Sequence, residues 1–169
     1  MQMQVVRALC SGERKKASDL LLGFDSRTLS LTADDFLHIF KYCARSPDPL
    51  FVIEIWRFME LKGISMNNRC SSLMMEALCK GGYLEEAFDI VNFLGESQCV
   101  YPVLPLYNRI LGSCTKMQSL IQANKCLDLM EKKMVGKSEV TYTELLKDSN
   151  CPAVSLLSST LCLTQGGSH

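Results

Sequence analysis

The chain has 169 residues, of which 47% are apolar, and its 18 basic and 18 acidic residues give a formal net charge of zero. This length fits one folded domain, and no run of about 18 apolar residues predicts a membrane span. Nucleic-acid binders usually carry a basic surplus, so the neutral balance argues against such binding unless basic residues gather on one face.

Nine cysteines are scattered along the chain without a Cys-x-x-Cys pair, and the only histidines are His38 and His169. An odd number of cysteines without an evident secretory signal indicates reduced, buried thiols of an intracellular protein. We therefore predict no metal site and no cofactor.

Residues 1–32 predict a partial upstream repeat and a linker. An apolar pattern over residues 5–10 ends at the turn Ser11-Gly12, and a second helix is expected over residues 17–22. The basic residues between positions 7 and 16 suggest a transit peptide, but Glu13 and Asp19 interrupt them, which favours a solvated helix face. Residues 24–31 are rich in Ser and Thr and predict a linker.

The first full repeat is expected over residues 33–67. Thr32 and Asp35 have the spacing of a helix start, and proline ends this helix near Pro47. Pro49 fits the opening turn of a second helix that runs to about Lys62. Trp56 lies in a column expected to face the core.

The second repeat, residues 68–103, contains the clearest helix-turn-helix signal, over residues 77–87. Apolar residues recur at helical spacing on both sides of Gly81 and Gly82, which are expected to supply the positive φ of a helix stop. Glu85 and Glu86 fit the first turn of the next helix, where negative charge is favourable.

A third repeat is expected over residues 104–138 and the start of a fourth over residues 139–147, before an irregular tail at residues 148–169. The tail is apolar enough over residues 153–163 for a short helix, but no capping helix follows. Because the uncapped end of a stacked array exposes apolar surface, we expect the chain to be a fragment or a shortened form of a longer array.

The four repeats share one period. A shift of 35 or 36 residues aligns six columns, which hold Phe36, Ser71, Tyr107 and Tyr142; Ile39, Met74, Ile110 and Leu145; Phe40, Met75, Leu111 and Leu146; Val52, Ala87 and Ala123; Trp56, Val91 and Leu127; and Met59, Leu94 and Met130. Since one helical hairpin cannot bury both its faces, copies at a fixed period must stack. The sequence therefore predicts an all-α fold, an α-solenoid of stacked helix-turn-helix repeats.

The period and the residues at its repeated positions resemble those of the pentatricopeptide repeat family. The matching stretches are residues 77–87, 106–111 and 140–146 and the repeat end Lys62-Gly63-Ile64. Tetratricopeptide repeats have a similar unit but a period of 34. A period of 35 or 36, with Tyr or Phe opening the first helix, favours the pentatricopeptide family. The resemblance implies binding of single-stranded RNA at about one base per repeat.

In that family, the fifth residue of the first helix and the last residue of the repeat contact one base edge, and the second residue packs against the base. The third repeat supplies Asn108 and Ser138, and Val140 fits the second position of the fourth repeat. The other repeats match less fully. In the first repeat the last residue is Asn67, but the fifth position holds Leu37, which cannot hydrogen-bond a base. In the second repeat the fifth position holds Ser72, but the repeat ends at Val103 after an insertion. In the fourth repeat the fifth position holds Thr143, and its partner position falls in the tail.

A basic column accompanies these positions. Arg45, Lys80 and Lys116 lie at the same place near the end of each first helix. They are placed either to follow RNA phosphates or to offset the negative end of the helix dipole, and the sequence supports both interpretations equally.

We predict binding of single-stranded RNA without catalysis, and the resemblance implies a role in processing, editing, stability or translation of transcripts in plant mitochondria or chloroplasts. Cys79 is not expected to be a nucleophile, because Cys43 and Cys114 fall within one residue of it in the repeat register. Neither a membrane nor a small-molecule substrate is expected as a partner. The alternative is a scaffold that binds protein partners, which Leu37 and the neutral charge favour.

Overall fold

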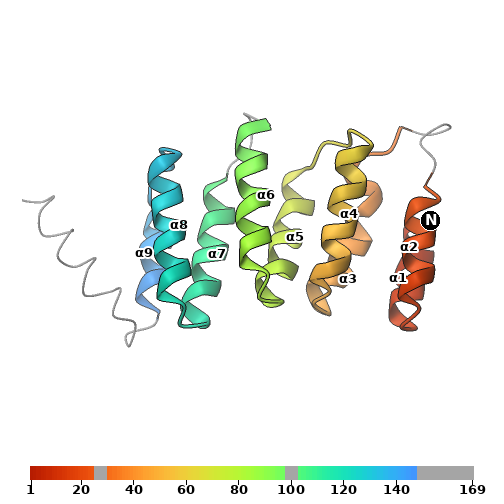
Figure 1. Ribbon diagram of the computed structural model, residues 1–169, viewed down its shortest axis with the longest axis horizontal. Helices are drawn as coiled ribbons and strands as arrows, with labels where there is room; N and C mark the ends of the chain where they lie inside the picture. The colour runs from red at the N-terminus through yellow and green to blue at the C-terminus, as the bar shows by residue number, and fades with distance from the viewer. Residues whose placement is uncertain (25–29, 98–102, 148–169) are drawn as a thin grey trace, which may run out of the picture. The chain divides into compact units, whose positions relative to one another are not determined.

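The computed structural model describes residues 1–24, 30–97 and 103–147, and within these ranges it contains helices and no strand. The elements are α1 (Gln2–Cys10), α2 (Arg14–Leu22), the 3-10 helix η1 (Ala33–Phe36), α3 (Leu37–Arg45), α4 (Pro49–Leu61), α5 (Asn68–Lys80), α6 (Leu84–Ser97), α7 (Leu104–Lys116), α8 (Leu120–Lys132) and α9 (Glu139–Leu146) (Figure 1). The predicted all-α, helical-repeat class is confirmed. None of the described helices is both long and apolar enough to cross a membrane.

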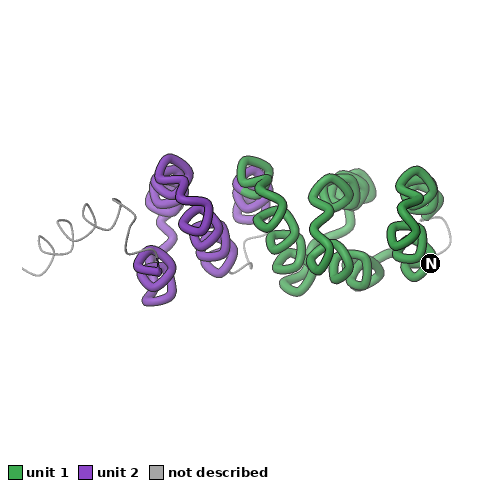
Figure 2. The backbone as a smooth tube through the Cα atoms, turned by 90° about the horizontal axis from the view of Figure 1, so that it is seen from below, with its two compact units in different colours: residues 1–87 green, residues 88–169 purple. Residues whose placement is uncertain are grey.

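The chain divides into two compact units, residues 1–87 and 88–169, with the boundary inside α6 (Figure 2). In unit 1, α1 packs on α2 and on α3, and α3 packs on α4 and on α5. The first helices α1 and α3 therefore each contact their own second helix and the first helix of the next repeat. This is the packing expected of stacked helical hairpins.

An aromatic cluster fills the core of unit 1. The ring centroids of Phe24 and Phe58 each lie 5.9 Å from that of Phe36, and Phe24 and Phe58 are 6.4 Å apart in an edge-to-face arrangement. Phe36 is fully buried. The cluster ties the residues after α2 to η1 and α4.

A charged cluster joins α2 to α4 beside this core. The Arg14 guanidinium donates from Nη1 to both carboxylate oxygens of Asp48, at 2.8 and 2.9 Å, and its carbon lies 4.6 Å from the ring centroid of Phe51. Asp48 also caps α4, because its Oδ1 accepts from Phe51 N at 3.0 Å. Arg14, part of the predicted solvated basic face, therefore has a structural role.

The predicted helix starts in unit 1 agree with the structure. The Asp35 carboxylate accepts from Thr32 N at 2.8 Å, so the two residues form the expected capping pair. Pro49 is the first residue of α4, which ends at Leu61. The first helix of this repeat, however, opens with the 3-10 turn η1 before it becomes α-helical.

The two-glycine turn differs from the prediction in one respect. Gly82 has a positive φ of 78°, but Gly81 has a right-handed φ of −80°, so the expectation for Gly81 is wrong. Gly81 meets a different need, since a Cβ there would lie 2.6 Å from Pro49 Cγ. The turn therefore needs one glycine for its backbone conformation and the other for close approach to α4.

In unit 2, α7 packs on α8 and on α9. Tyr107 is almost fully buried, and its hydroxyl donates to Asn92 Oδ1 at 3.1 Å. Ile110 and Leu111 of α7 and Met130 of α8 are also fully buried. The side chain of α7 that opens the repeat thus lies in the core, as its column predicts.

Most of the predicted columns are buried, with four departures, one of which is Tyr142, a half-buried residue of α9. Leu146 is 60% exposed, because the described helix that packs closely on α9 is α7 alone. Trp56 and Leu127 are half-buried, whereas Val91 in their column is fully buried. The insertion near residues 101–102 and the tail lie outside the described residues, and the repeat boundaries themselves remain a prediction.

Candidate nucleic-acid interface

A polar cluster joins α7 to α9 in unit 2. The Thr141 hydroxyl donates to Asn108 Oδ1 at 2.6 Å, and Thr141 Oγ1 accepts from Ser138 N at 3.0 Å. Thr141 is fully buried and Asn108 is 8% exposed. The sequence paired Asn108 with Ser138, and in the structure Thr141 lies between them and holds the amide oxygen.

The start of α9 produces this cluster. Ser138 is the residue before the helix, and Thr141 follows three positions later, so the two form a capping box. Such a box normally satisfies only the first amides of its own helix. Here the Thr141 hydroxyl also reaches the preceding repeat. Sequence reasoning missed Thr141, and the available signal was its three-residue spacing from Ser138.

The side-chain amide of Asn108 is hydrogen-bonded at its oxygen. Its oxygen accepts from Thr141, and among the described residues no hydrogen bond is recorded for its nitrogen. An amide nitrogen carries two protons that suit the acceptor atoms of a base. The cluster therefore orients Asn108 as a hydrogen-bond donor.

A shallow depression lies one helical turn further along α7. It is lined by Gly112, Lys116, Glu144 and Lys147, among others. A Cβ at Gly112 would lie 2.5 Å from Glu144 Oε2, so the glycine allows this carboxylate to approach the backbone of α7. Glu144 pairs with Lys147. No partner is recorded for Lys116 within the described part of unit 2, which leaves its positive charge available to an anion.

The candidates of unit 1 are engaged differently. Asn67 caps α5 by accepting from Cys70 N at 2.9 Å, and its Nδ2 donates to Asp34 Oδ1 at 2.9 Å. Both ends of this side chain are therefore used inside the protein. Ser72 is half-buried, and Leu37 is a buried apolar residue at the fifth position.

Two further candidates lie on α9. Thr143 is exposed, but its hydroxyl donates to Glu139 O at 2.8 Å, the carbonyl one turn earlier in the same helix. Val140 is 54% exposed and offers an apolar surface. Val140 can therefore pack against a flat ring, whereas the Thr143 hydroxyl proton is already donated.

The three residues of the basic column, Arg45, Lys80 and Lys116, differ in their interactions. Lys80 Nζ donates to Ala44 O at 3.0 Å and pairs with Glu76 Oε1 at 2.6 Å, so this lysine caps the end of the preceding first helix. For Arg45, as for Lys116, the described residues provide no recorded partner, and both side chains are exposed. The dipole interpretation therefore describes Lys80, while Arg45 and Lys116 remain candidates for phosphate contacts.

A pentatricopeptide repeat-containing protein of Arabidopsis thaliana is 45% identical to the chain over 147 residues, which are 87% of the chain and 19% of that protein. The chain belongs to the pentatricopeptide repeat family. No family model matches it. The chain spans about a fifth of the length of this relative.

The pentatricopeptide repeat positions of this chain differ between its first and third repeats. In the third repeat, the fifth residue of the first helix, Asn108, and the last residue, Ser138, meet through Thr141. In the first repeat, the fifth residue is the buried Leu37 and the last residue, Asn67, is fully hydrogen-bonded. Only the third repeat combines both polar positions with an exposed, unpaired cation in the described chain.

Three buried cysteines, Cys43, Cys70 and Cys114, have thiols whose pKa is raised by burial. Burial raises the pKa of Cys43 to about 12 and those of Cys70 and Cys114 to about 11. A thiol is nucleophilic only as the thiolate, so these side chains act as small apolar groups at neutral pH. The repeat register places the buried Cys79 in the same region of its first helix.

Proposed function

We propose that the chain binds single-stranded RNA through its first-helix positions, as a non-catalytic part of a pentatricopeptide repeat protein. The observation that carries the proposal is the α7–α9 cluster, in which Thr141 fixes the oxygen of Asn108 and leaves the amide nitrogen without a recorded partner. A polar side chain held in one orientation recognises a base edge at a lower entropic cost than a free one.

The neighbouring groups supply the remaining contacts. Lys116 carries a positive charge two turns along α7 from Asn108 and suits a phosphate. Val140, at the second position of the fourth repeat, offers an exposed apolar surface for one face of a base. In unit 1, Arg45 and Ser72 provide a phosphate contact and a hydroxyl. Binding by this chain alone is expected to be weak, because one repeat has the full set and the net charge is zero.

Membership of the family supports a proposal for the cellular role. We propose that the protein acts on transcripts of a plant mitochondrion or chloroplast, in their processing, editing, stability or translation. No group of three or more side chains suited to hold a metal ion occurs among the described residues. The proposed contribution to these processes is recognition of the RNA.

The test is binding of the chain to a pool of short single-stranded RNAs, measured by fluorescence anisotropy between about 50 and 200 mM salt. Replacing Asn108 by Ala is expected to weaken binding of the preferred sequences by roughly 1–3 kcal/mol. Replacing Lys116 by Ala is expected to weaken binding to all sequences and to reduce the salt slope by about one.

The matched control is Lys132→Ala, which removes an exposed lysine from α8 with no recorded partner in the described chain. This variant should bind like the parent chain. Equal loss from Lys116→Ala and Lys132→Ala would mean that the attraction is diffuse, and would contradict a site on α7. Absence of binding at the lowest salt would contradict RNA binding by this chain.

The second candidate function is a scaffold for protein partners. It is favoured by the buried Leu37 at a recognition position and by the zero net charge. A chain that leaves all RNAs unbound but retains a folded repeat structure by circular dichroism would support this candidate.

A further inference from the structure

The outer face of α4 in unit 1 exposes two large apolar side chains. One face of this helix buries Phe51, Val52, Ile55, Phe58 and Met59. On the opposite face, Leu50 is 56% exposed and Leu61 is 86% exposed. Two large apolar side chains on the solvent side of one helix leave apolar surface in contact with water. The described residues provide no cover for these two leucines.

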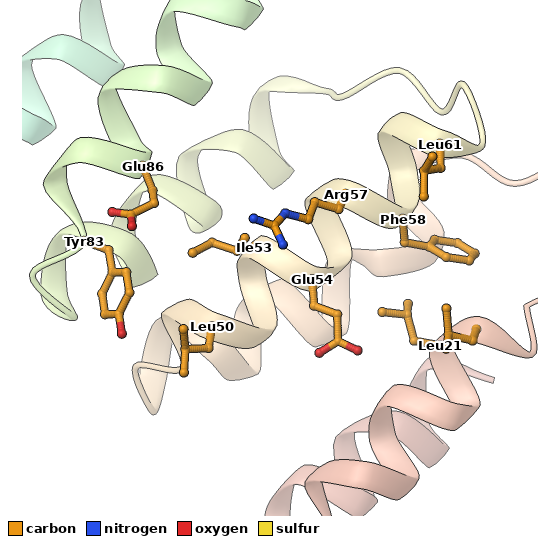
Figure 3. A pocket seen from close by; sticks show the side chains of 10 residues that line it. Leu21, Leu50, Ile53, Glu54, Arg57, Phe58, Leu61, Tyr83 and Glu86 are labelled. Atoms are coloured by element: carbon orange, nitrogen blue, oxygen red, sulfur yellow. The ribbon is translucent and has the colours of Figure 1, made fainter.

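This face lines a groove with a volume of about 500 Å³ (Figure 3). Leu50 and Leu61 lie toward opposite ends of α4, and Glu54 and Arg57 lie between them. Leu22 of α2, which is 68% exposed, lines one side, and Tyr83 and Glu86 line the other. The exposed face thus has apolar ends and a charged middle.

The charged middle is only partly used within the chain. Glu54 Oε2 is 3.4 Å from Arg14 Nη2, and Arg14 already makes shorter bonds to Asp48. Arg57 is exposed and has no recorded partner in residues 1–24, 30–97 and 103–147. Arg57 is therefore available for contacts outside the chain, and Glu54 can add such a contact to its long bond with Arg14.

The spacing of these four residues is self-complementary. Leu50, Glu54, Arg57 and Leu61 are separated by four, three and four positions, which is the alternation of a coiled-coil seam on one helix face. When two such helices run antiparallel about a twofold axis through the middle of α4, each Leu50 meets a Leu61. Each Glu54 then meets an Arg57, and the symmetry makes every contact twice.

We propose that a second copy of this chain docks on the outer face of α4, so that two α4 helices pack antiparallel in a symmetric homodimer. The leucines exclude water at the two ends of the seam, and two Glu54–Arg57 pairs form in its middle. Residues lining the groove, such as Tyr83, form the rim. The proposed RNA-binding residues of unit 1 lie on the first helices and at their caps, outside this seam.

Sedimentation velocity of the full 169-residue chain at protein concentrations up to about 1 mM tests the proposal. The expected result is a concentration-dependent monomer–dimer equilibrium. Leu61→Asp should shift the chain to monomer, because it places a charge at the apolar end of the seam. The fold should remain intact, since this side chain is largely exposed. The matched control is Leu146→Asp, an exposed leucine of α9, which should leave the equilibrium unchanged.

Charge exchange gives a test that does not depend on removing contacts. Glu54→Arg places two basic groups opposite each other in the seam, and Arg57→Glu places two acidic groups there. Each variant alone should dimerise at least about tenfold more weakly than the parent chain, because like charges meet twice. In an equimolar mixture of the two variants every charged contact is attractive, so a heterodimer should form with restored affinity.

Three outcomes would overturn the proposal: a parent chain that stays monomeric over the whole concentration range, single-charge variants that dimerise like the parent, or a mixture that remains monomeric although both variants are folded by circular dichroism. The first outcome would leave the groove to a different protein partner. Restoration in the mixture would be incompatible with an effect of the substitutions on folding alone.

Discussion

Three helices of unit 1, α1, α4 and α5, and two of unit 2, α7 and α8, end with the same hydrogen bond but with different residues. In unit 1, the residue with positive φ after the helix is glycine each time, at Gly12, Gly63 and Gly82, with φ of 72°, 65° and 78°. In unit 2, the equivalent positions hold Gln118 and Met134, with φ of 52° and 54°. After each residue, the next amide donates back to a carbonyl five positions earlier, as Tyr83 does to Leu78 and Ser119 does to Cys114.

This difference separates the geometry of a helix end from the residue that suits it best. A left-handed backbone costs a residue with a side chain roughly 1–2 kcal/mol. Unit 2 keeps the same turns without glycine, so the packing of its helices must hold the two strained residues in place. The comparison indicates that unit 1 uses local preference and unit 2 relies on contacts between helices.

The largest expected loss of stability comes from a substitution in the core of unit 1. Phe36→Ala removes the central ring of the aromatic cluster and should lower the free energy of unfolding by roughly 3–5 kcal/mol. Urea unfolding followed by circular dichroism measures the change. Phe93→Ala, which removes a ring that is 39% exposed, is the control and should cost much less. Equal losses would mean that the cluster does not dominate this core.

The contact between α7 and α9 in unit 2 should be next in size. Thr141→Val keeps the shape of the side chain but leaves Asn108 Oδ1 and Ser138 N without a partner, which should cost roughly 1–3 kcal/mol. Thr141→Ser retains the hydroxyl and should lose less stability. Hydrogen exchange of the α9 amides reports the change locally. Unchanged exchange in the valine variant would show that the cluster does not hold α9.

The close approach of Gly81 to Pro49 predicts a steric cost in unit 1. Gly81→Ala places a Cβ 2.6 Å from a rigid ring, so it should destabilise by roughly 1–3 kcal/mol. Gly95→Ala in α6 has the opposite expectation, because its nearest contact would be Val103 Cγ1 at 3.5 Å and alanine favours the helix. Thermal unfolding of the two variants should shift in opposite directions, and a shared direction would contradict this explanation.

Buried thiols predict a loss of stability at high pH in both units. The pKa of Cys43 in unit 1 is about 12 and that of Cys114 in unit 2 is about 11, both raised by burial. The unfolded thiols ionise near pH 9, so stability should be complete below that pH and fall as the pH rises toward 11 or 12.

Each thiol should contribute a fall of about 1 kcal/mol between pH 8 and 9.5, measured by urea unfolding. The control is Cys43→Ala, which should reduce the slope with pH although it lowers the overall stability. A slope that is unchanged in this variant would mean that Cys43 ionises equally in the folded and unfolded chain.

The smallest expected change in stability comes from substitutions at the helix ends. Gln118→Gly and Met134→Gly relieve the positive φ and should each stabilise the chain by roughly 0.5–1 kcal/mol, since both side chains are exposed. Gln118→Ala keeps the strain and is the control. Gly82→Ala introduces the same strain into unit 1 and should destabilise by a similar amount. A gain from the alanine control equal to that from glycine would contradict the role of φ.

The repeated hairpins could be predicted because they depend on local signals. Apolar spacing placed the helices, Thr32 with Asp35 marked a helix start, and the repeat period predicted which columns are buried. The distinct roles of Gly81 and Gly82 could not be predicted, because one depends on backbone conformation and the other on a ring 32 positions away in the chain.

The candidate site was predicted only in its outline. Asn108 and Ser138 were identified from the resemblance, but Thr141 was missed, because the bond that matters joins residues 33 positions apart. The exposure of Leu146 was also missed, since a column predicts burial only where a neighbouring helix covers it. Contacts between repeats therefore limit what the period alone reveals.

Asn67 has a consequence for how recognition can change. Its amide starts α5 and holds Asp34 of the same repeat, so the atoms that would read a base are those that begin a helix. An exchange of Asn67 that alters its proposed base contact also removes the side-chain cap of α5. Ser138 shares its capping task with Thr141. The proposed base contact at the end of the third repeat can therefore change with less effect on helix capping than that at the end of the first.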